Sequence, residues 1–176
     1  FRELGADGIV AGCLLADGTL DTERLLKIRE CAGNLHMTLH RAFDVCKDPG
    51  QALEASVSLG IDTILTSGQE ENCMAGRELL QQLIVQAADK IEILAGGGVN
   101  AEVIEILKKE IGAYSFHMSG KQRLNSGMSY RNERVSMGLP GLSEFDIFRT
   151  ELAQIQRARE NEKKKSLRIL RIQEQE

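Results

Sequence analysis

Three segments of the sequence repeat one pattern, which limits the fold more than any other feature does. Each has a Gly where a helix would end, then a short apolar strand, then another Gly seven or eight residues after the first. The first Gly suits a left-handed helix cap, and the second lets the chain turn off the strand. The segments are residues 4–12, 59–68 and 111–120. Their first glycines are 55 and 52 residues apart, about two strand–helix units each, which predicts a repeating β/α chain.

Apolar residues at helical spacing fill the stretches between these segments. Helices are expected over 22–32 with Asp21 as N-cap, from Pro49, over 72–88, and from a cap at Asn100. The expected strands are residues 8–12, 36–41, 62–67, 91–95 and 113–118. Five β/α units in strict alternation predict a parallel sheet in a domain over 1–120.

The pattern changes after residue 120. Residues 121–142 contain Gly, Ser, Asn and the second of two prolines, and we expect a loop or linker there. Ser143 and Asp146 form an approximate capping box, which predicts a charged, amphipathic helical tail over 143–176. Such a tail is either a solvated helix or a helix that binds a partner.

Charged and polar residues stand at the end of the expected strand 36–41 and just after it. His40, Arg41 and Asp44 lie within five residues, at the carboxyl end of a strand, where parallel β/α folds place their functional groups. In a catalytic interpretation His40 is a general acid or base, Arg41 holds an anion, and Asp44 orients one of them. The alternative is an Arg41–Asp44 ion pair that only fixes the loop.

A second group of residues suggests an anion site at the same edge. Gly-rich backbone followed by a helix is a common cradle for phosphate. The candidates are Ser67, Gly96, Gly97, Gly98 and Ser119. The alternatives are that the glycines serve only a tight turn and that Ser67 only begins a loop.

Composition argues against some classes of binding partner and indicates the state of the cysteines. The net charge of −4 argues against general nucleic-acid binding, and no apolar run approaches the roughly 20 residues that span a bilayer. Four cysteines lie far apart without a C-x-x-C pair, which fits reduced thiols in a cytosolic or nuclear protein.

Five motifs together resemble the CutC family of copper homeostasis proteins. They are Gly5–Val10 with Asp17-Gly18, His40–Asp44, Ile64–Gln69, Gly96–Val99 and Phe116-His117. The resemblance covers residues 4 to about 120 and implies a (β/α)₈ TIM barrel, of which these five strands would be strands 4 to 8. Strands 1 to 3 of the family pattern are missing, the tail differs from the family's C-terminal part, and Ala95 stands where Pro is expected. We therefore expect a truncated chain or isoform whose open sheet edges favour a homo-oligomer.

The resemblance also implies Cu(I) as a ligand. Cu(I) selects thiolate and imidazole groups, and the candidates by position are Cys13, Cys46, His40 and His117. A free Cys is more often a small buried hydrophobic residue. Three hypotheses follow: copper binding and homeostasis, a barrel enzyme acting through His40, Arg41 and Asp44 on a small phosphorylated or carboxylated substrate, and an inactive or regulatory isoform whose tail binds a partner.

Overall fold

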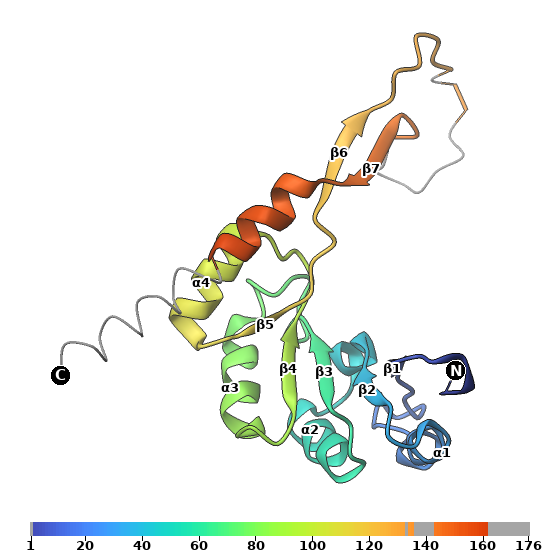
Figure 1. Cartoon of the computed structure of the whole chain (residues 1–176), viewed down its shortest axis with the longest axis vertical. Helices are drawn as coiled ribbons and strands as arrows, with labels where there is room; N and C mark the ends of the chain where they lie inside the picture. Colours follow the sequence, from blue (N-terminus) through green and yellow to red (C-terminus); the bar gives the residue numbers. More distant parts are fainter. Residues whose placement is uncertain (1, 133, 136–142, 162–176) are drawn as a thin grey trace, which may run out of the picture. The chain divides into compact units, whose positions relative to one another are not determined.

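The computed structural model describes residues 2–132, 134–135 and 143–161, and it divides into two units, 1–118 and 119–176. The first unit is an α/β fold with one parallel sheet (Figure 1). Its strands lie in sequence order: β1 (Gly8–Ala11), β2 (His36–Leu39), β3 (Thr63–Thr66), β4 (Glu92–Ala95) and β5 (Ser115–Phe116). The connecting helices are α1 (Thr22–Ala32), α2 (Pro49–Ser58), α3 (Arg77–Ala87) and α4 (Ala101–Ile111). This confirms the predicted α/β class and parallel sheet.

Helix starts follow the local sequence. The side chains of Asp21, Asp48 and Asn100 accept the N–H groups of residues three positions later, and Pro49 opens α2. The helix expected from Asn72 begins only at Arg77, because the Asn72 side chain accepts the N–H groups of Met74 and Ala75 and closes a turn first.

The central strand is also shorter than expected. β2 ends at Leu39, and the residues after it form a 3₁₀ helix, η2 (Arg41–Val45), instead of continuing the strand to residue 41. His40 is its N-cap, since the ring Nδ1 accepts the Ala42 N–H at 3.0 Å. A second 3₁₀ helix, η1 (Arg2–Leu4), precedes β1.

The two faces of the sheet differ in what they bury. On the helix-covered face, alternate strand residues pack with residues from all four helices in one apolar core. This face includes Met37, Leu39, Ile64, Ile93 and Ala95. On the opposite face Val10 is exposed, and Leu65 and Leu94 are only half-buried and lie outside that core.

The opposite face carries a row of polar side chains at the first residues of four strands. His36 Nε2 lies 2.9 Å from Thr63 Oγ1, and that hydroxyl donates to Glu92 Oε2 at 2.9 Å. Ser115 donates to the other oxygen of Glu92. The row therefore ties β2, β3, β4 and β5 together with side-chain hydrogen bonds.

The second unit corrects two element predictions. Residues 121–125, expected as loop, form β6 (Lys121–Asn125), and residues 146–150, expected as helix, form β7 (Asp146–Thr150). The strands pair antiparallel, so cross-strand pairing overrides the apolar spacing that suggested a helix. Ser143 Oγ accepts the Phe145 N–H in a turn and does not begin a helix.

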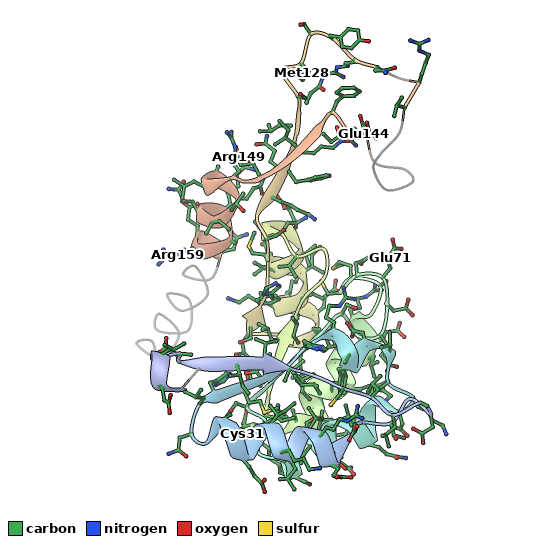
Figure 2. All side chains as sticks on the ribbon, turned by 90° about the vertical axis from the view of Figure 1, so that its right-hand side faces the viewer. Cys31, Glu71, Met128, Glu144, Arg149 and Arg159 are labelled. Atoms are coloured by element: carbon green, nitrogen blue, oxygen red, sulfur yellow. The ribbon has the colours of Figure 1, made fainter. Side chains whose placement is uncertain are left out.

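A helix does follow, over residues 152–161 (Figure 2). The rest of the predicted tail, 162–176, and part of the predicted linker, 136–142, lie outside the described residues. Within the part of the chain that is described, no helix is long and apolar enough to cross a membrane.

Candidate ligand site at the carboxyl ends of the strands

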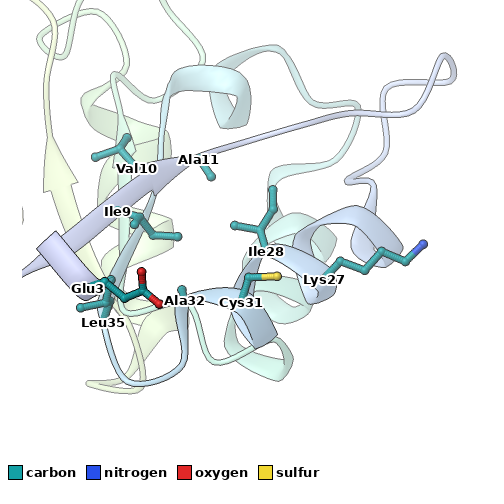
Figure 3. Close-up of a pocket in the computed structure, with 9 residues that line it drawn as sticks. All are labelled: Glu3, Ile9, Val10, Ala11, Lys27, Ile28, Cys31, Ala32 and Leu35. Atoms are coloured by element: carbon teal, nitrogen blue, oxygen red, sulfur yellow. The ribbon is translucent and has the colours of Figure 1, made fainter. Parts of the chain in front are cut away.

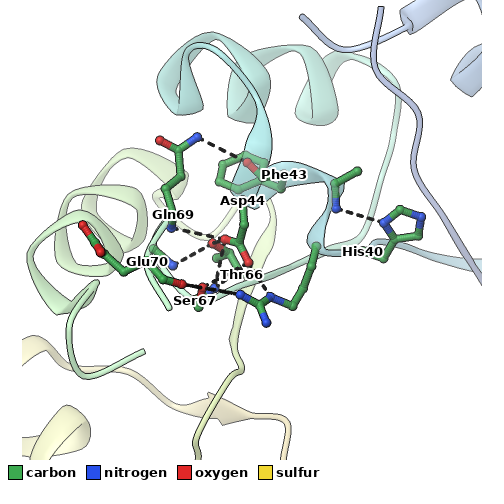
Figure 4. Close-up of polar contacts among 10 residues, drawn as sticks. His40, Phe43, Asp44, Thr66, Ser67, Gln69 and Glu70 are labelled. Carbon is green, nitrogen blue, oxygen red and sulfur yellow. Dashed lines mark hydrogen bonds and ion pairs between the residues drawn. The ribbon is translucent and has the colours of Figure 1, made fainter. Parts of the chain in front are cut away.

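Asp44 is the centre of the polar contacts that follow β2 and β3 (Figure 4). Its carboxylate accepts the hydroxyls of Thr66 and Ser67 and the backbone N–H groups of Ser67 and Gln69, at distances up to 3.2 Å. It also pairs with Arg41 Nε at 2.6 Å, although only 7% of the Asp44 side chain is exposed. A buried carboxylate with this many donors ties η2 firmly to the Thr66–Gln69 turn.

The guanidinium of Arg41 is held at one side and free at the other. Nε pairs with Asp44, and Nη2 donates to Ser67 Oγ at 2.7 Å. Nη1 has no hydrogen-bond or ion-pair partner among the described residues. It lies 3.7 Å from the position that a Cβ on Gly97 would take. Arg41 therefore presents one fixed, half-exposed cationic edge beside the glycine loop, which is residues Gly96–Gly98.

The glycine loop provides space and backbone donors. Gly96 donates its N–H to Thr66, and the Gly97 carbonyl accepts the N–H of Cys73, so the loop is anchored on both sides. Within the described part of the chain, the N–H groups of Gly97 and Gly98 have no partner. Both residues have positive φ, 88° and 74°, a conformation that other residues rarely adopt.

The other predicted anion ligands have different roles or locations. The Ser67 hydroxyl donates to the Glu70 carbonyl at 2.5 Å or to Asp44, while it accepts from Arg41, so its only proton is already used. Ser67 thus supports Arg41. Ser119 belongs to the second unit, and its part in an anion site stays a prediction.

His40 does not join the Asp44 cluster. Its Nδ1 accepts from Ala42, which places the proton of the neutral ring on Nε2, and the ring lies against Gly12. Figure 4 shows the ring pointing away from Asp44. His40 therefore stands apart from Arg41 and Asp44, while the Arg41–Asp44 ion pair fits both interpretations, since Asp44 orients Arg41 and also fixes the loop. The exposed His117 lies beside the glycine loop, with its Cβ 3.7 Å from where a Cβ on Gly96 would be.

The predicted copper ligands are not assembled. Cys13 Sγ is 3.9 Å from the Asp21 carbonyl, and Cys46 Sγ accepts from Gln69 Nε2 at 3.3 Å. Burial raises the pKa of both thiols, and the Asp21 charge raises that of Cys13 further. In the described ranges, no three His, Cys, Asp or Glu side chains group where they could hold a metal ion.

Sequence reasoning missed the extent of the Thr66–Gln69 frame. Ser67 was expected either to bind an anion or to begin a loop, and its contact with Asp44 was not predicted; Thr66, Ser67 and Gln69 together supply four of the donors to Asp44. The positive φ of Gln69, 58°, was not predictable, because glycine is the residue that usually signals it. The polar row His36–Thr63–Glu92–Ser115 was also missed, although its members alternate correctly for one face.

Comparisons with known proteins agree on one family. The family model described as the CutC family matches residues 1–122. A family protein CutC of Bacteroides fragilis is 47% identical over 137 residues, which are 78% of this chain and 55% of that protein. A Mus musculus protein named copper homeostasis protein cutC homolog is 38% identical over 152 residues, 86% of this chain and 56% of that protein.

A solved structure is similar as well. The crystal structure of the putative copper homeostasis protein CutC from Streptococcus agalactiae matches with a TM-score of 0.63 and 31% identity, over 66% of this chain and 57% of that one. The chain thus spans little more than half the length of these proteins. Because the mouse match covers 152 residues, it extends beyond residue 122, so part of the tail does align with the family.

Proposed function

This chain belongs to the CutC family, and on that premise we propose that it serves copper homeostasis by binding Cu(I). The support is the family itself and the name of the mouse relative, copper homeostasis protein cutC homolog. The soft side chains that suit Cu(I) are Cys13, Cys46, His40 and His117, and they would have to come together on binding. Since a thiol must lose its proton to bind the metal, and burial raises both thiol pKa values, affinity should rise with pH.

An anaerobic Cu(I) titration against a competing chelator tests this proposal. Cys13→Ser and Cys46→Ser should each weaken binding by at least about tenfold, while Cys31→Ser, at an exposed thiol outside the candidate set, should not. Absence of stoichiometric binding in a folded sample, or equal binding by all three variants, would overturn it.

The geometry favours a second candidate function, the binding of a small phosphorylated or carboxylated molecule at the glycine loop. The observation that carries it is the free Nη1 edge of Arg41, held by Asp44 and Ser67 beside the space at Gly97. The N–H groups of a guanidinium Nη1 can donate charge-assisted hydrogen bonds to phosphate or carboxylate oxygens, and the fixed orientation of Arg41 lowers the entropy cost of such bonds. The arrangement supports binding more directly than catalysis, because His40 stands outside it.

A titration with inorganic phosphate, monitored by NMR, tests the anion site. Arg41→Gln should weaken phosphate binding about tenfold or more, in line with the loss of a charge-assisted contact. Arg77→Gln is the matched control, because Arg77 is equally exposed (46% against 47%) and lies in the same unit. Equal affinity in the two variants would contradict an Arg41 site.

The wider architecture belongs to the same proposal. We propose that the sheet is part of a (β/α)₈ barrel, because strands in sequence order with their connecting helices packed on one face have the barrel arrangement. Homo-oligomerisation, a cytosolic or nuclear location and a partner-binding tail stay predictions.

A further inference from the structure

The first unit has a cavity that does not include the glycine loop, and its chemistry differs from that of the loop. It has a volume of about 730 Å³ and lies between β1 and α1 (Figure 3). Its lining is mostly apolar and includes Ile9, Val10, Ile28 and Leu35. A charged oxygen ligand would gain few hydrogen bonds there in return for its lost hydration. The glycine loop is therefore the better location for a phosphorylated or carboxylated ligand.

Asn72 stands beside the glycine loop with one end of its side chain fixed. Its Oδ1 accepts the backbone N–H groups of Met74 and Ala75 at 3.1 and 3.0 Å, while Nδ2 has no hydrogen-bond partner among the described residues. Only the oxygen of a side-chain amide can accept N–H groups, so these two bonds also establish which end is the NH₂ group. The half-buried Asn72 therefore offers two N–H donors in a fixed orientation.

The Asn72 turn and the glycine loop are in contact. The N–H of Cys73 donates to the Gly97 carbonyl at 3.0 Å, which ties the two segments together. A Cβ on Gly97 would lie 3.6 Å from Asn72 Cα, and a Cβ on Gly98 would lie 3.2 Å from Asn72 Cβ. The Cβ position at Gly97 is also 3.7 Å from Arg41 Nη1. Arg41 and Asn72 therefore border the same space beside Gly97.

The charges around this space make neutral donors important. Asp44 pairs with Arg41 Nε at 2.6 Å, so it offsets much of the arginine charge. Glu70 and Glu71, which precede Asn72, are exposed, and Figure 4 shows the Glu70 carboxylate pointing away from Asp44. An anion beside the glycine loop would thus meet only a partial excess of positive charge. Its binding would depend on N–H donors as well as on the guanidinium, and Asn72 supplies two of them.

The number of donors distinguishes between the two classes of anion. Arg41 Nη1 and Asn72 Nδ2 each carry two N–H groups. Gly97 and Gly98 each contribute one backbone N–H that has no partner within the described ranges. A carboxylate offers about four acceptor sites on its two oxygens, which is fewer than these donors, whereas a phosphoryl group has a third terminal oxygen. A phosphoryl group therefore leaves fewer donors unpaired.

On the premise of the anion site proposed above, we propose that its ligand carries a phosphoryl group and that Asn72 selects this group over a carboxylate. Arg41 Nη1 and the backbone N–H groups of the glycine loop bind anions of either class. Asn72 Nδ2 supplies the additional donors that the third oxygen of a phosphoryl group uses. An aspartate at this position would accept the same two backbone N–H groups but would present a negative oxygen to the ligand. The amide of Asn72 thus matters for binding and not for the turn.

Phosphate and acetate titrations of the full chain, monitored by NMR, test the role of Asn72. Asn72→Ser keeps an acceptor for the turn but removes the amide donors, so phosphate should bind about tenfold more weakly. The acetate affinity should change by less than about threefold, because a carboxylate does not use those donors. Asn72→Asp should weaken phosphate binding further, since it adds a negative charge.

Asn34→Ser and Asn34→Asp are the matched controls. Asn34 is exposed in the turn between α1 and β2, which lies at the opposite ends of the strands. Both control variants should bind phosphate as the native chain does. Asn72→Asp should also unfold near the native urea midpoint, because its carboxylate can accept the N–H groups of Met74 and Ala75.

The outcomes separate the role of Asn72 from the anion site itself. Equal phosphate affinity in the native chain and Asn72→Ser, or equal weakening of phosphate and acetate binding, would overturn the role of Asn72 even where Arg41→Gln removes binding. A native chain that does not bind phosphate would overturn the anion site, and the role of Asn72 with it. Equal phosphate affinity in Arg41→Gln and Arg77→Gln would do the same.

Discussion

The two faces of the five-stranded sheet differ in the contacts that their side chains make. The helix-covered face buries Met37, Leu39 and Ile64 completely, in one core with the four helices. The opposite face leaves Leu65 half-buried and joins its strands through the hydroxyls and carboxylate of the Thr63–Glu92–Ser115 row. The contrast suggests that the helix-covered face provides most of the stability, while the opposite face and the strand ends are free to carry polar chemistry.

Neighbouring residues of β3 give the most direct test of this contrast. Ile64 faces the helices with no exposed area, whereas Leu65 faces the other way. Ile64→Ala should lower the free energy of unfolding by about 4 kcal/mol, because it leaves a cavity in a packed core. Leu65→Ala should cost about 1 kcal/mol, since a half-buried side chain loses less contact. Urea unfolding of both variants measures the difference, and equal losses would remove the distinction between the faces.

The polar contacts of Asp44, in η2 after the end of β2, should also contribute to stability. Asp44→Ala should lower the free energy of unfolding by about 3 kcal/mol, because it leaves Arg41 and the N–H groups of Ser67 and Gln69 without their acceptor. Asp44→Asn keeps the shape and one acceptor oxygen, so it should cost less. Chemical denaturation checks both. An unchanged free energy of unfolding in Asp44→Ala would mean that the contacts of Asp44 do not stabilise the fold.

Substitutions at two glycines of positive φ should distinguish an effect on phosphate binding from an effect on stability. Gly97→Ala places a side chain at positive φ and fills the space beside Arg41. It should cost about 1–2 kcal/mol of stability and abolish phosphate binding. Gly112→Ala is the control, because Gly112 also has positive φ but open space around its Cβ position. It should cost similar stability and leave binding intact, which NMR titration of the two variants would show.

The smallest expected effect concerns pH and the thiols of the helix-covered core. Burial raises the pKa of Cys46 and Cys73 above the ordinary thiol value, so folding favours their protonated forms. The stability that they contribute is complete below the unfolded-state pKa, near 9.0 for a thiol, and is lost as pH rises through the higher folded-state value. Urea midpoints should therefore fall at alkaline pH. Cys73→Ala should reduce this fall of the urea midpoint with pH, whereas Cys31→Ser should not.

The sequence predicted the first unit better than the second for a physical reason. In residues 1–118, local signals agree with tertiary packing: Asp21, Asp48 and Asn100 cap helices, and alternate apolar residues mark the buried face. Phe145 and Phe148 are three residues apart, a spacing that suits one face of a helix, but the pairing of β7 with β6 decided the conformation of residues 146–150. Strand pairing depends on residues about 25 positions away, which local spacing does not reveal.

The candidate site shows the same division. The placement of Arg41, Asp44 and the glycine loop at one edge followed from the sequence, because parallel strands bring their carboxyl ends together. The hydrogen-bond partners of these residues did not follow from the sequence. His40 caps η2, Ser67 uses its proton on the backbone or on Asp44, and Asp44 gathers donors from a turn more than 20 residues later.

By itself, the sequence determined the β/α order, the caps, the buried alternation and the family, because each depends on short-range periodicity or on motifs in series. The tertiary structure decided which face of the sheet stays open, which edge of Arg41 stays free, and that residues 121–125 and 146–150 form a ribbon. These features arise where distant segments compete for the same hydrogen-bond donors and acceptors, and only their arrangement in space selects the pairing.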